Sequence, residues 1–134
     1  MKREWDKVSV ERMKGIHPDL RKLADAVLQA APWPIRVTEG LRTIERQRQL
    51  VAIKASKTMR SRHLTGHAID VVPYIDLDRD GKIETEELYN KQLFRQLIPI
   101  AKDCAEKLSI SVVWGYDWGW DMPHWELNAR FYPA

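Results

Sequence analysis

The ten residues "SRHLTGHAID" at positions 61–70 carry three side chains that can bind a metal ion, and the local structure of this segment decides the fold around them. These side chains are His63, His67 and Asp70. If the segment were a single helix, their spacing would place all three on one face. Gly66 and the β-branched run in "AIDVV" instead predict a turn that leads into a strand.

A turn followed by a strand limits which of these residues can share one metal ion. On a strand, His67 and Asp70 point to opposite faces because their separation is odd. The turn leaves His63 free to pair with either of them. Catalytic zinc sites use three protein ligands and one water molecule, and imidazole nitrogen and carboxylate oxygen are both suitable ligands. The segment therefore predicts two ligands, without deciding which two, and a third ligand from elsewhere in the chain.

His124 is the most informative of the remaining histidines. His17 stands before Pro18 at a predicted helix start, where a capping or surface role is expected. His124 lies in "DMPHWEL", directly after a loop crowded with aromatic residues, and Asp121 precedes it by three positions. So many aromatic residues favour a hydrophobic core, but a carboxylate beside a potential ligand can act as a general base toward metal-bound water.

The composition is that of a soluble globular domain. The chain has 134 residues, of which 44% are hydrophobic and 31% are charged. No apolar run approaches the roughly 20 residues that cross a bilayer, so we expect no stable membrane insertion. The N-terminal "MKREWDKVSVERMKG" has no apolar segment behind its positive charge, so we expect no secretory signal and synthesis in a cytoplasm. We expect a single domain over residues 1–134 and a monomer.

The basic charge of the chain limits the classes of partner that it can bind but does not identify one of them. The net charge is +3 and the sequence pI is near 9.1, which suits nucleic acid, an anionic cell envelope or acidic peptides. The basic segment 42–63 is interrupted by Glu45 and by apolar helix positions, and no nucleic-acid-binding motif accompanies it. We therefore expect no nucleic-acid partner.

Helical and strand patterns alternate along the chain and predict an α+β fold. Apolar residues at helical spacing predict three helices, over 17–31, 44–55 and 86–109. Thr43 is the expected cap of the second helix, and Pro99 should kink or divide the third. Strands are predicted over 35–39, 67–75, 110–115 and 123–127. Together these elements indicate a single small domain with a short, mainly antiparallel sheet packed against helices.

The acidic segment "DLDRDGKIETEE" at 76–87 matches the spacing of a calcium-binding EF-hand loop. A strand rather than a helix is expected before it, so the prediction is an EF-hand-like loop and not a paired EF-hand. The alternative is an Asp-Gly hairpin turn with solvated acids. The expected calcium ligands are Asp76, Asp78, Asp80, the backbone carbonyl of Lys82, Glu84 and Glu87.

Three motifs in the chain together resemble one peptidase family. They are "EGLRT" at 39–43, "S-x-H-x-x-G-x-A-x-D" at 61–70 and "DMPHWEL" at 121–127. This combination resembles the zinc D-alanyl-D-alanine peptidases, which include the VanX and VanY types and the phage L-alanyl-D-glutamate endolysins. The resemblance extends over nearly the whole chain and is closest to the phage endolysins.

The resemblance implies a choice among the metal ligands. It assigns zinc to His63, Asp70 and His124, and it leaves His67 outside the ligand set. His67 is then a residue that contacts the substrate or a zinc ligand, and the alternative is an exposed or hydrogen-bonded histidine without such a role. It places the general base at Asp121. Glu126 is the reserve candidate for that base, or a residue that orients a zinc ligand.

The resemblance also implies roles for two residues outside the metal-ligand set. Arg42 in "EGLRT" matches an arginine beside the scissile carbonyl, where a guanidinium can stabilise the developing oxyanion. The alternative is a surface arginine that pairs with Glu39 or Glu45. Ser61 is expected to bind substrate or to fix the metal-binding loop.

The function implied is that of a phage-type endolysin, which hydrolyses the L-Ala–D-Glu bond in the stem peptides of peptidoglycan and so degrades the host cell wall. Such an enzyme is made in the host cytoplasm and acts in the periplasm after release. The resemblance also makes calcium regulation plausible, since some phage endolysins respond to calcium. The alternatives are a D-Ala-D-Ala carboxypeptidase or dipeptidase, and a non-catalytic module that binds calcium or the cell wall.

Overall fold

The computed structural model describes residues 2–54 and 61–133, and within them four strands form one antiparallel sheet. Its strand order is β1-β2-β4-β3, and β2 pairs with both β1 and β4. The strands are β1 Ile35–Glu39, β2 Ala68–Pro73, β3 Val112–Trp114 and β4 His124–Leu127. Central placement of β2 brings the segment that follows the 61–66 turn to the middle of the sheet. The predicted α+β fold with a short antiparallel sheet is confirmed.

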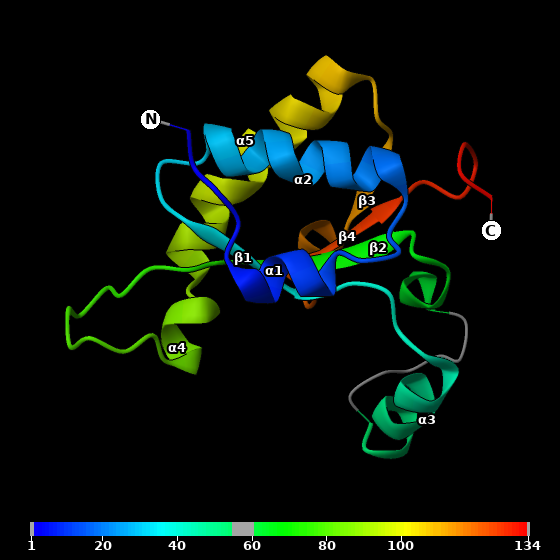
Figure 1. Ribbon diagram of the computed structural model, residues 1–134, viewed down its shortest axis with the longest axis horizontal. Coiled ribbons are helices and arrows are strands. Elements are labelled where there is room, and N and C mark those ends of the chain that lie inside the picture. The colour runs from blue at the N-terminus through cyan, green and yellow to red at the C-terminus, as the bar shows by residue number, and fades with distance from the viewer. Residues whose placement is uncertain (1, 55–60, 134) are drawn as a thin grey trace.

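Two helices, α2 Pro18–Ala30 and α5 Lys91–Leu108, lie together along the sheet (Figure 1). Their buried apolar side chains form one core with residues of β1, β2 and β4. Because these apolar positions recur every three or four residues, each helix turns one stripe toward the sheet. The core includes Leu20, Leu23, Val27, Leu97, Ala101, Val37, Ile69, Val71, Trp125 and Leu127.

The starts of α2 and of α3 Ile44–Ala52 are held by the side chains expected there. His17 Nδ1 accepts the backbone N–H of Asp19 at 3.0 Å, which confirms its capping role. Thr43 Oγ1 caps α3 by accepting from the N–H of Arg46 at 3.0 Å. The helix predicted over 44–55 ends at Ala52, and position 55 lies outside the described residues.

The predicted third helix, 86–109, is divided, but not at the predicted place. A short helix, α4 Thr85–Leu88, is followed by Asn90, whose side chain accepts from Gln92 N and Leu93 N and starts α5. Pro99 lies inside α5 and does not divide it. Because Pro99 is on the exposed side of the helix, the carbonyl that it deprives of a partner can bond to water.

The turn predicted at Gly66 is present. A short 3₁₀ helix at Arg62–Thr65 ends at Gly66, which has φ +76°, and β2 begins two residues later. A Cβ at Gly66 would lie 2.6 Å from the carbonyl oxygen of Gly15, so both the conformation and the contact require glycine. This turn sends His63 and Asp70 into the same region of the fold.

The N-terminal part of the chain forms one element that the sequence patterns did not predict. A short helix, α1 Lys7–Arg12, begins at Asp6, whose side chain accepts from Ser9 N, and it packs beside β1. In the described part of the chain, no helix has the length and apolar character needed to cross a membrane.

Candidate metal centre

Three ligand atoms converge at the point where β2 and β4 meet the turn before β2. His63 Nε2 and His124 Nδ1 each lie 3.2 Å from the same carboxylate oxygen, Oδ1 of Asp70. The three ligand atoms lie within 4.8 Å of one another. Asp70 and His124 are direct cross-strand partners, whereas His63 comes from the 3₁₀ turn. The pairing of β2 with β4 therefore joins two sequence motifs that are more than fifty residues apart.

The ring nitrogens that face away from this point are held by other groups. His63 Nδ1 is 3.0 Å from the carbonyl oxygen of Gly40, and His124 Nε2 is 2.8 Å from Oε1 of Glu126. Both rings are buried, with 2% and 6% of their surface exposed. Since each outer nitrogen has an acceptor, the inner nitrogens His63 Nε2 and His124 Nδ1 can serve as ligands.

The charges at the centre reinforce one another. Burial would raise the pKa of Asp70, but hydrogen bonds with His124 and His63 outweigh it and hold that pKa well below its ordinary value. Burial would lower the pKa of His124, but its hydrogen bonds with Asp70 and Glu126 raise it to about 9. The ionised Asp70 therefore keeps a proton on His124 until a stronger cation replaces it.

Asp121 lies beside the three candidate ligands without joining them. Its Oδ2 is 3.9 Å from His124 Nδ1, and its backbone oxygen accepts the N–H of His124 at 3.2 Å. Burial and then the negative charge of Asp70 raise the pKa of Asp121. A Cβ at Gly115 would lie 2.3 Å from the Asp121 backbone oxygen and 2.7 Å from Cβ of His124, so glycine at 115 permits this close approach.

Arg42 is anchored next to His63. Its side chain donates to Glu39 Oε1 at 2.9 Å and to Gln47 Oε1 at 2.6 Å, and its backbone N–H donates to the carbonyl oxygen of His63 at 2.9 Å. Only 9% of the side chain is exposed. The pairing with Glu39 named in the alternative interpretation is therefore present, but the arginine is partly buried and its side chain is mostly covered.

Ser61 connects the arginine to the metal-binding turn. Its Oγ accepts the backbone N–H of His63 at 3.2 Å and lies 3.5 Å from Nη1 of Arg42. These contacts fix the turn that carries His63. A role of Ser61 in binding substrate or in fixing a metal-binding loop stays a prediction.

His67 lies outside the group of three ligands. Its Nδ1 is 2.7 Å from Thr65 Oγ1, and its ring centroid is 5.5 Å from that of His17. Burial, together with the positive charges of Arg62 and His17, lowers the pKa of His67. The structure thus separates His67 from Asp70, although His67 lies just before β2 and not on it.

Several residues at this site were not predicted from the sequence. Gly40 belongs to the "EGLRT" motif, so the motif itself was a signal for it. Gln47 is fully buried within α3, and no local pattern marks it. Trp118 places its ring centroid 5.3 Å from that of His124. Burial and then the charges of Asp70 and Asp121 raise the pKa of Tyr89, so this phenol lies in the electric field of the centre.

The acidic loop brings carboxylates together in a second place. Ligand oxygens of Asp76, Asp78, Asp80 and Glu87 lie within 4.8 Å of one another. Asp76 Oδ2 accepts the N–H of Gly81 at 2.8 Å, and the N–H of Lys82 donates to Asp80 Oδ1 at 2.8 Å.

Glu87 closes this loop. It accepts from the N–H groups of Leu77 and of Glu84, the latter at 3.1 Å. A hydrogen bond with Asp80 and the charge of that residue raise the pKa of Glu84 to about 7. The acids of this loop therefore repel one another in the absence of a cation.

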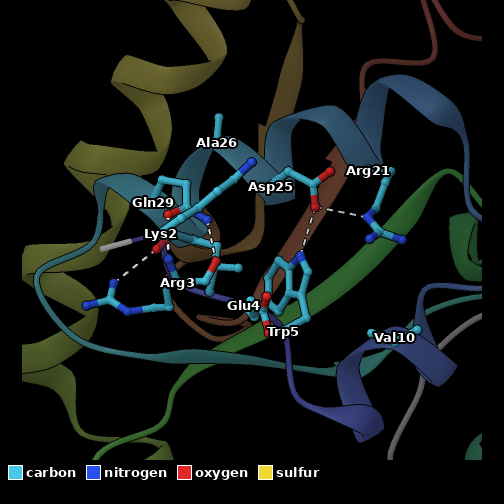
Figure 2. A pocket seen from close by; sticks show the side chains of 10 residues that line it. Lys2, Arg3, Glu4, Trp5, Val10, Arg21, Asp25, Ala26 and Gln29 are labelled. Atoms are coloured by element: carbon cyan, nitrogen blue, oxygen red, sulfur yellow. Dashed lines mark hydrogen bonds and ion pairs between the residues drawn. The ribbon is translucent and has the colours of Figure 1, made fainter.

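A surface hollow of about 650 Å³ lies elsewhere, between the N-terminal segment and α2 (Figure 2). Its polar groups bind one another: Trp5 Nε1 and Arg21 both donate to Asp25, at 2.8 and 2.9 Å, and Arg3 N donates to Gln29 at 2.9 Å. These contacts fasten the N-terminal segment to α2. These polar groups that line the hollow therefore already have hydrogen-bond partners within the protein.

Comparisons with known proteins agree on one family. The profile of the phage L-alanyl-D-glutamate peptidase family matches residues 1–132. The L-alanyl-D-glutamate peptidase of Escherichia phage T5 is 29% identical over 118 residues, which cover 86% of this chain and 81% of that protein. A protein of the same name from Listeria phage A118 is 32% identical over 126 residues, covering 85% of this chain and 41% of that protein. The crystal structure of the L-Ala D-Glu endopeptidase ChiX of Serratia marcescens superposes with a TM-score of 0.84 at 35% identity, over 99% of this chain and 96% of that one.

Proposed function

Since the chain belongs to the phage L-alanyl-D-glutamate peptidase family, we propose that it is a zinc-dependent endopeptidase that hydrolyses the L-Ala–D-Glu bond of peptidoglycan stem peptides. The family resemblance drawn from the sequence motifs is confirmed, as is the prediction of a peptidase. The observation that carries the proposal is the convergence of His63 Nε2, His124 Nδ1 and Asp70 Oδ1 on one point.

The donor set at this point fits zinc. Two imidazole nitrogens and one carboxylate oxygen are a set found in catalytic zinc sites, where a fourth position stays open for water or substrate. Gly40 and Glu126 hold the outer ring nitrogens, as partners of metal-bound histidines commonly do. Bound zinc would supply Lewis acidity toward the scissile carbonyl and toward the attacking water.

Asp121 is the proposed general base. Its carboxylate stands 3.9 Å from the ligand nitrogen of His124, close enough to reach a water molecule at the open position. In this role it accepts the proton of the attacking water and passes it to the leaving amine. Burial and the charge of Asp70 raise its pKa, which makes it a better proton acceptor than a solvated aspartate.

Arg42 is proposed to stabilise the negative charge that develops on the carbonyl oxygen. Glu39 and Gln47 hold its guanidinium in place beforehand, so little reorganisation is needed during the reaction. Ser61 supports this arrangement by fixing the turn of His63. Glu126 is proposed to orient His124 rather than to act as base, because it bonds to the nitrogen that faces away from the centre. We propose no role for His67 in catalysis.

We propose that the acidic loop binds calcium. Four carboxylates face one another there, and Oδ1 of Asp76 is buried without a hydrogen-bond partner in the part of the chain that the structure describes. A buried, unpartnered carboxylate oxygen among like charges is a group that a hard cation would satisfy. Glu84 and the carbonyl of Lys82 complete the proposed ligand set.

We also propose where the enzyme acts. Relatives from phages favour synthesis in a host cytoplasm and action on the cell wall in the periplasm after release. The positive net charge suits the approach to an anionic envelope. A monomer is the proposed state.

The bond that is cut can be identified by mass spectrometry of Gram-negative peptidoglycan digested with and without a zinc chelator. Chelator-sensitive release of stem peptides that begin at D-glutamate supports the proposal. Loss of terminal D-alanine alone would make the enzyme a carboxypeptidase with the same metal centre. Absence of cleavage with added zinc and calcium would favour a non-catalytic wall-binding module.

A further inference from the structure

Two tryptophans form an exposed stack that leads away from the metal centre. The ring of Trp118 lies against His124, with centroids 5.3 Å apart, and the ring of Trp120 stacks on Trp118 at 5.4 Å with an interplanar angle of 30°. The exposed fractions are 41% for Trp118 and 66% for Trp120. The stack therefore begins at a candidate metal ligand, and its exposure increases from Trp118 to Trp120.

The hydrophobic core does not account for this stack. Trp114 and Trp125 come from the same part of the chain and pack edge to face in the core, with 8% and 0% of their surface exposed. Trp118 and Trp120 instead keep a large part of their apolar surface exposed. Adjacent exposed aromatic rings beside a reactive centre are typical of a binding surface rather than of a folding core.

The metal centre has two different flanks. Arg42, with Glu39 and Gln47, lies beside His63, whereas the tryptophan stack lies beside His124. The two histidine rings meet edge to face with centroids 5.0 Å apart. One side of the centre is therefore polar and carries the Arg42–Glu39 ion pair, and the other is aromatic.

The substrate also differs on the two sides of the bond that is cut: one side is charged, and the other leads to a sugar ring. On the glutamate side, the stem peptide carries carboxylates and an amino group. On the alanine side, a single residue joins the scissile bond to the lactyl group of a muramic acid ring. One residue spans at most ~3.6 Å, so the sugar must lie next to the metal centre during the reaction. A pyranose ring offers a face of C–H groups that packs well on the electron-rich face of an indole.

We propose that the Trp118–Trp120 stack is a subsite for the N-acetylmuramyl sugar that bears the stem peptide. This inference rests on the proposed function and extends it, because it makes the enzyme select peptides that are still attached to glycan. Trp118 lies nearer the metal ligand and Trp120 nearer solvent, so Trp120 is the residue whose removal disturbs the centre less.

The test compares two substrates that differ only in the sugar. One is a stem peptide with an acetylated N-terminal L-alanine, and the other is the same peptide on a GlcNAc–MurNAc disaccharide. For Trp120→Ala we expect kcat/KM on the disaccharide substrate to fall by about threefold to tenfold, the range for loss of one aromatic stacking contact, mainly through KM. On the sugar-free peptide we expect no change, and Trp120→Phe should retain most of the preference. Phe131→Ala, which removes an aromatic ring that is 62% exposed, is the matched control.

A second measurement separates this inference from the proposed function. The peptide-free disaccharide is titrated into the wild-type protein, and the indole N–H signals are followed by NMR. Selective shifts at Trp118 and Trp120, with Trp114 and Trp125 unchanged, support the subsite even if no bond is cut. Equal losses on both substrates in Trp120→Ala, or no selective indole shift, would overturn it. Failure of the wild type to cut either substrate would reject the proposed activity instead.

Discussion

The metal centre and the acidic loop both bring potential metal-ligating side chains together, but they are built in different ways. The centre takes His63, Asp70 and His124 from separate elements and buries both histidines, and hydrogen bonds already orient them. The loop takes its acids from the continuous stretch 76–87, where Asp78 and Asp80 are exposed.

This difference predicts how a bound cation would affect each site. At the centre, the negative charge of Asp70 and the positive charge of His124 compensate one another, and Asp70 also lies within hydrogen-bond distance of His63, so the fold holds the geometry in advance. In the loop, a hydrogen bond with Asp80 and the negative charges of Asp80 and Asp78 raise the pKa of Glu84 to about 7. We therefore expect zinc to change the activity more than the stability of the protein, and calcium to change stability more than the chemistry.

The largest effect is expected for the proposed general base, whose removal should lower the rate of catalysis and leave zinc binding unchanged. Asp121→Ala should lower kcat by about 10²- to 10⁴-fold, because the general base is lost, while zinc binding persists. Steady-state kinetics and metal analysis of the same preparation measure both. Asp117→Ala is the matched control, since that carboxylate lies in the same loop and pairs with Lys102. Full activity in a zinc-loaded Asp121→Ala protein would refute the assignment.

The next effect tests whether the centre is oriented in advance. Glu126→Ala should weaken zinc binding by about 10- to 100-fold, the usual range for loss of a partner that holds a metal-bound histidine. At saturating zinc, most of the activity should return. Competition with a chelator of known affinity measures the change, and Glu11→Ala, which removes a surface ion pair, is the control. An unchanged zinc affinity would show that Glu126 does not position His124.

The pH dependence of zinc binding is a further test of the state of His124 before zinc binds. In the metal-free protein the pKa of His124 is raised to about 9, so this ring is protonated at neutral pH and must lose its proton to bind zinc. Zinc affinity should therefore fall by about tenfold for each pH unit below about 9. Calorimetry in buffers of different ionisation enthalpy should show proton release on binding. A flat affinity between pH 6 and roughly 8 would contradict the proposed ligand state.

The smallest expected effect concerns the acidic loop. Millimolar calcium should raise Tm by a few degrees, in proportion to the saturation of the site, because calcium relieves the repulsion among the acids. Asp78→Asn should abolish this rise, whereas Glu106→Gln, on the exposed side of α5, should leave it intact. Differential scanning calorimetry measures it. An identical Tm with and without calcium would leave the loop as an acidic turn.

The same comparison explains what could be predicted from the sequence. The acidic loop is local, so its spacing alone indicated which acids would meet. The choice between His63 and His67 depends on the pairing of β2 with β4, which spacing does not contain, and the family resemblance was needed to make it. Strand 35–39 was predicted with its observed ends. The helix division at Asn90 was not, because the apolar periodicity continues across the cap.

The contacts of Gln47 and Trp118 could not be predicted from the local sequence for a similar reason. Each acts on a residue brought near by the tertiary fold, Arg42 for the glutamine and His124 for the tryptophan. A buried glutamine in a helix and an exposed tryptophan in a loop carry no periodic signal of their own. Their roles emerge only once the sheet places the two histidines together.

The most direct test of the central claim is a zinc titration of the metal-depleted enzyme, with bound zinc and stem-peptide release measured on the same samples. We predict that cleavage rises in parallel with occupancy and saturates at one zinc per chain, and that His63→Ala and His124→Ala proteins neither retain zinc at that site nor cleave. Full cleavage by the zinc-free enzyme, or undiminished cleavage by either histidine variant, would contradict the account.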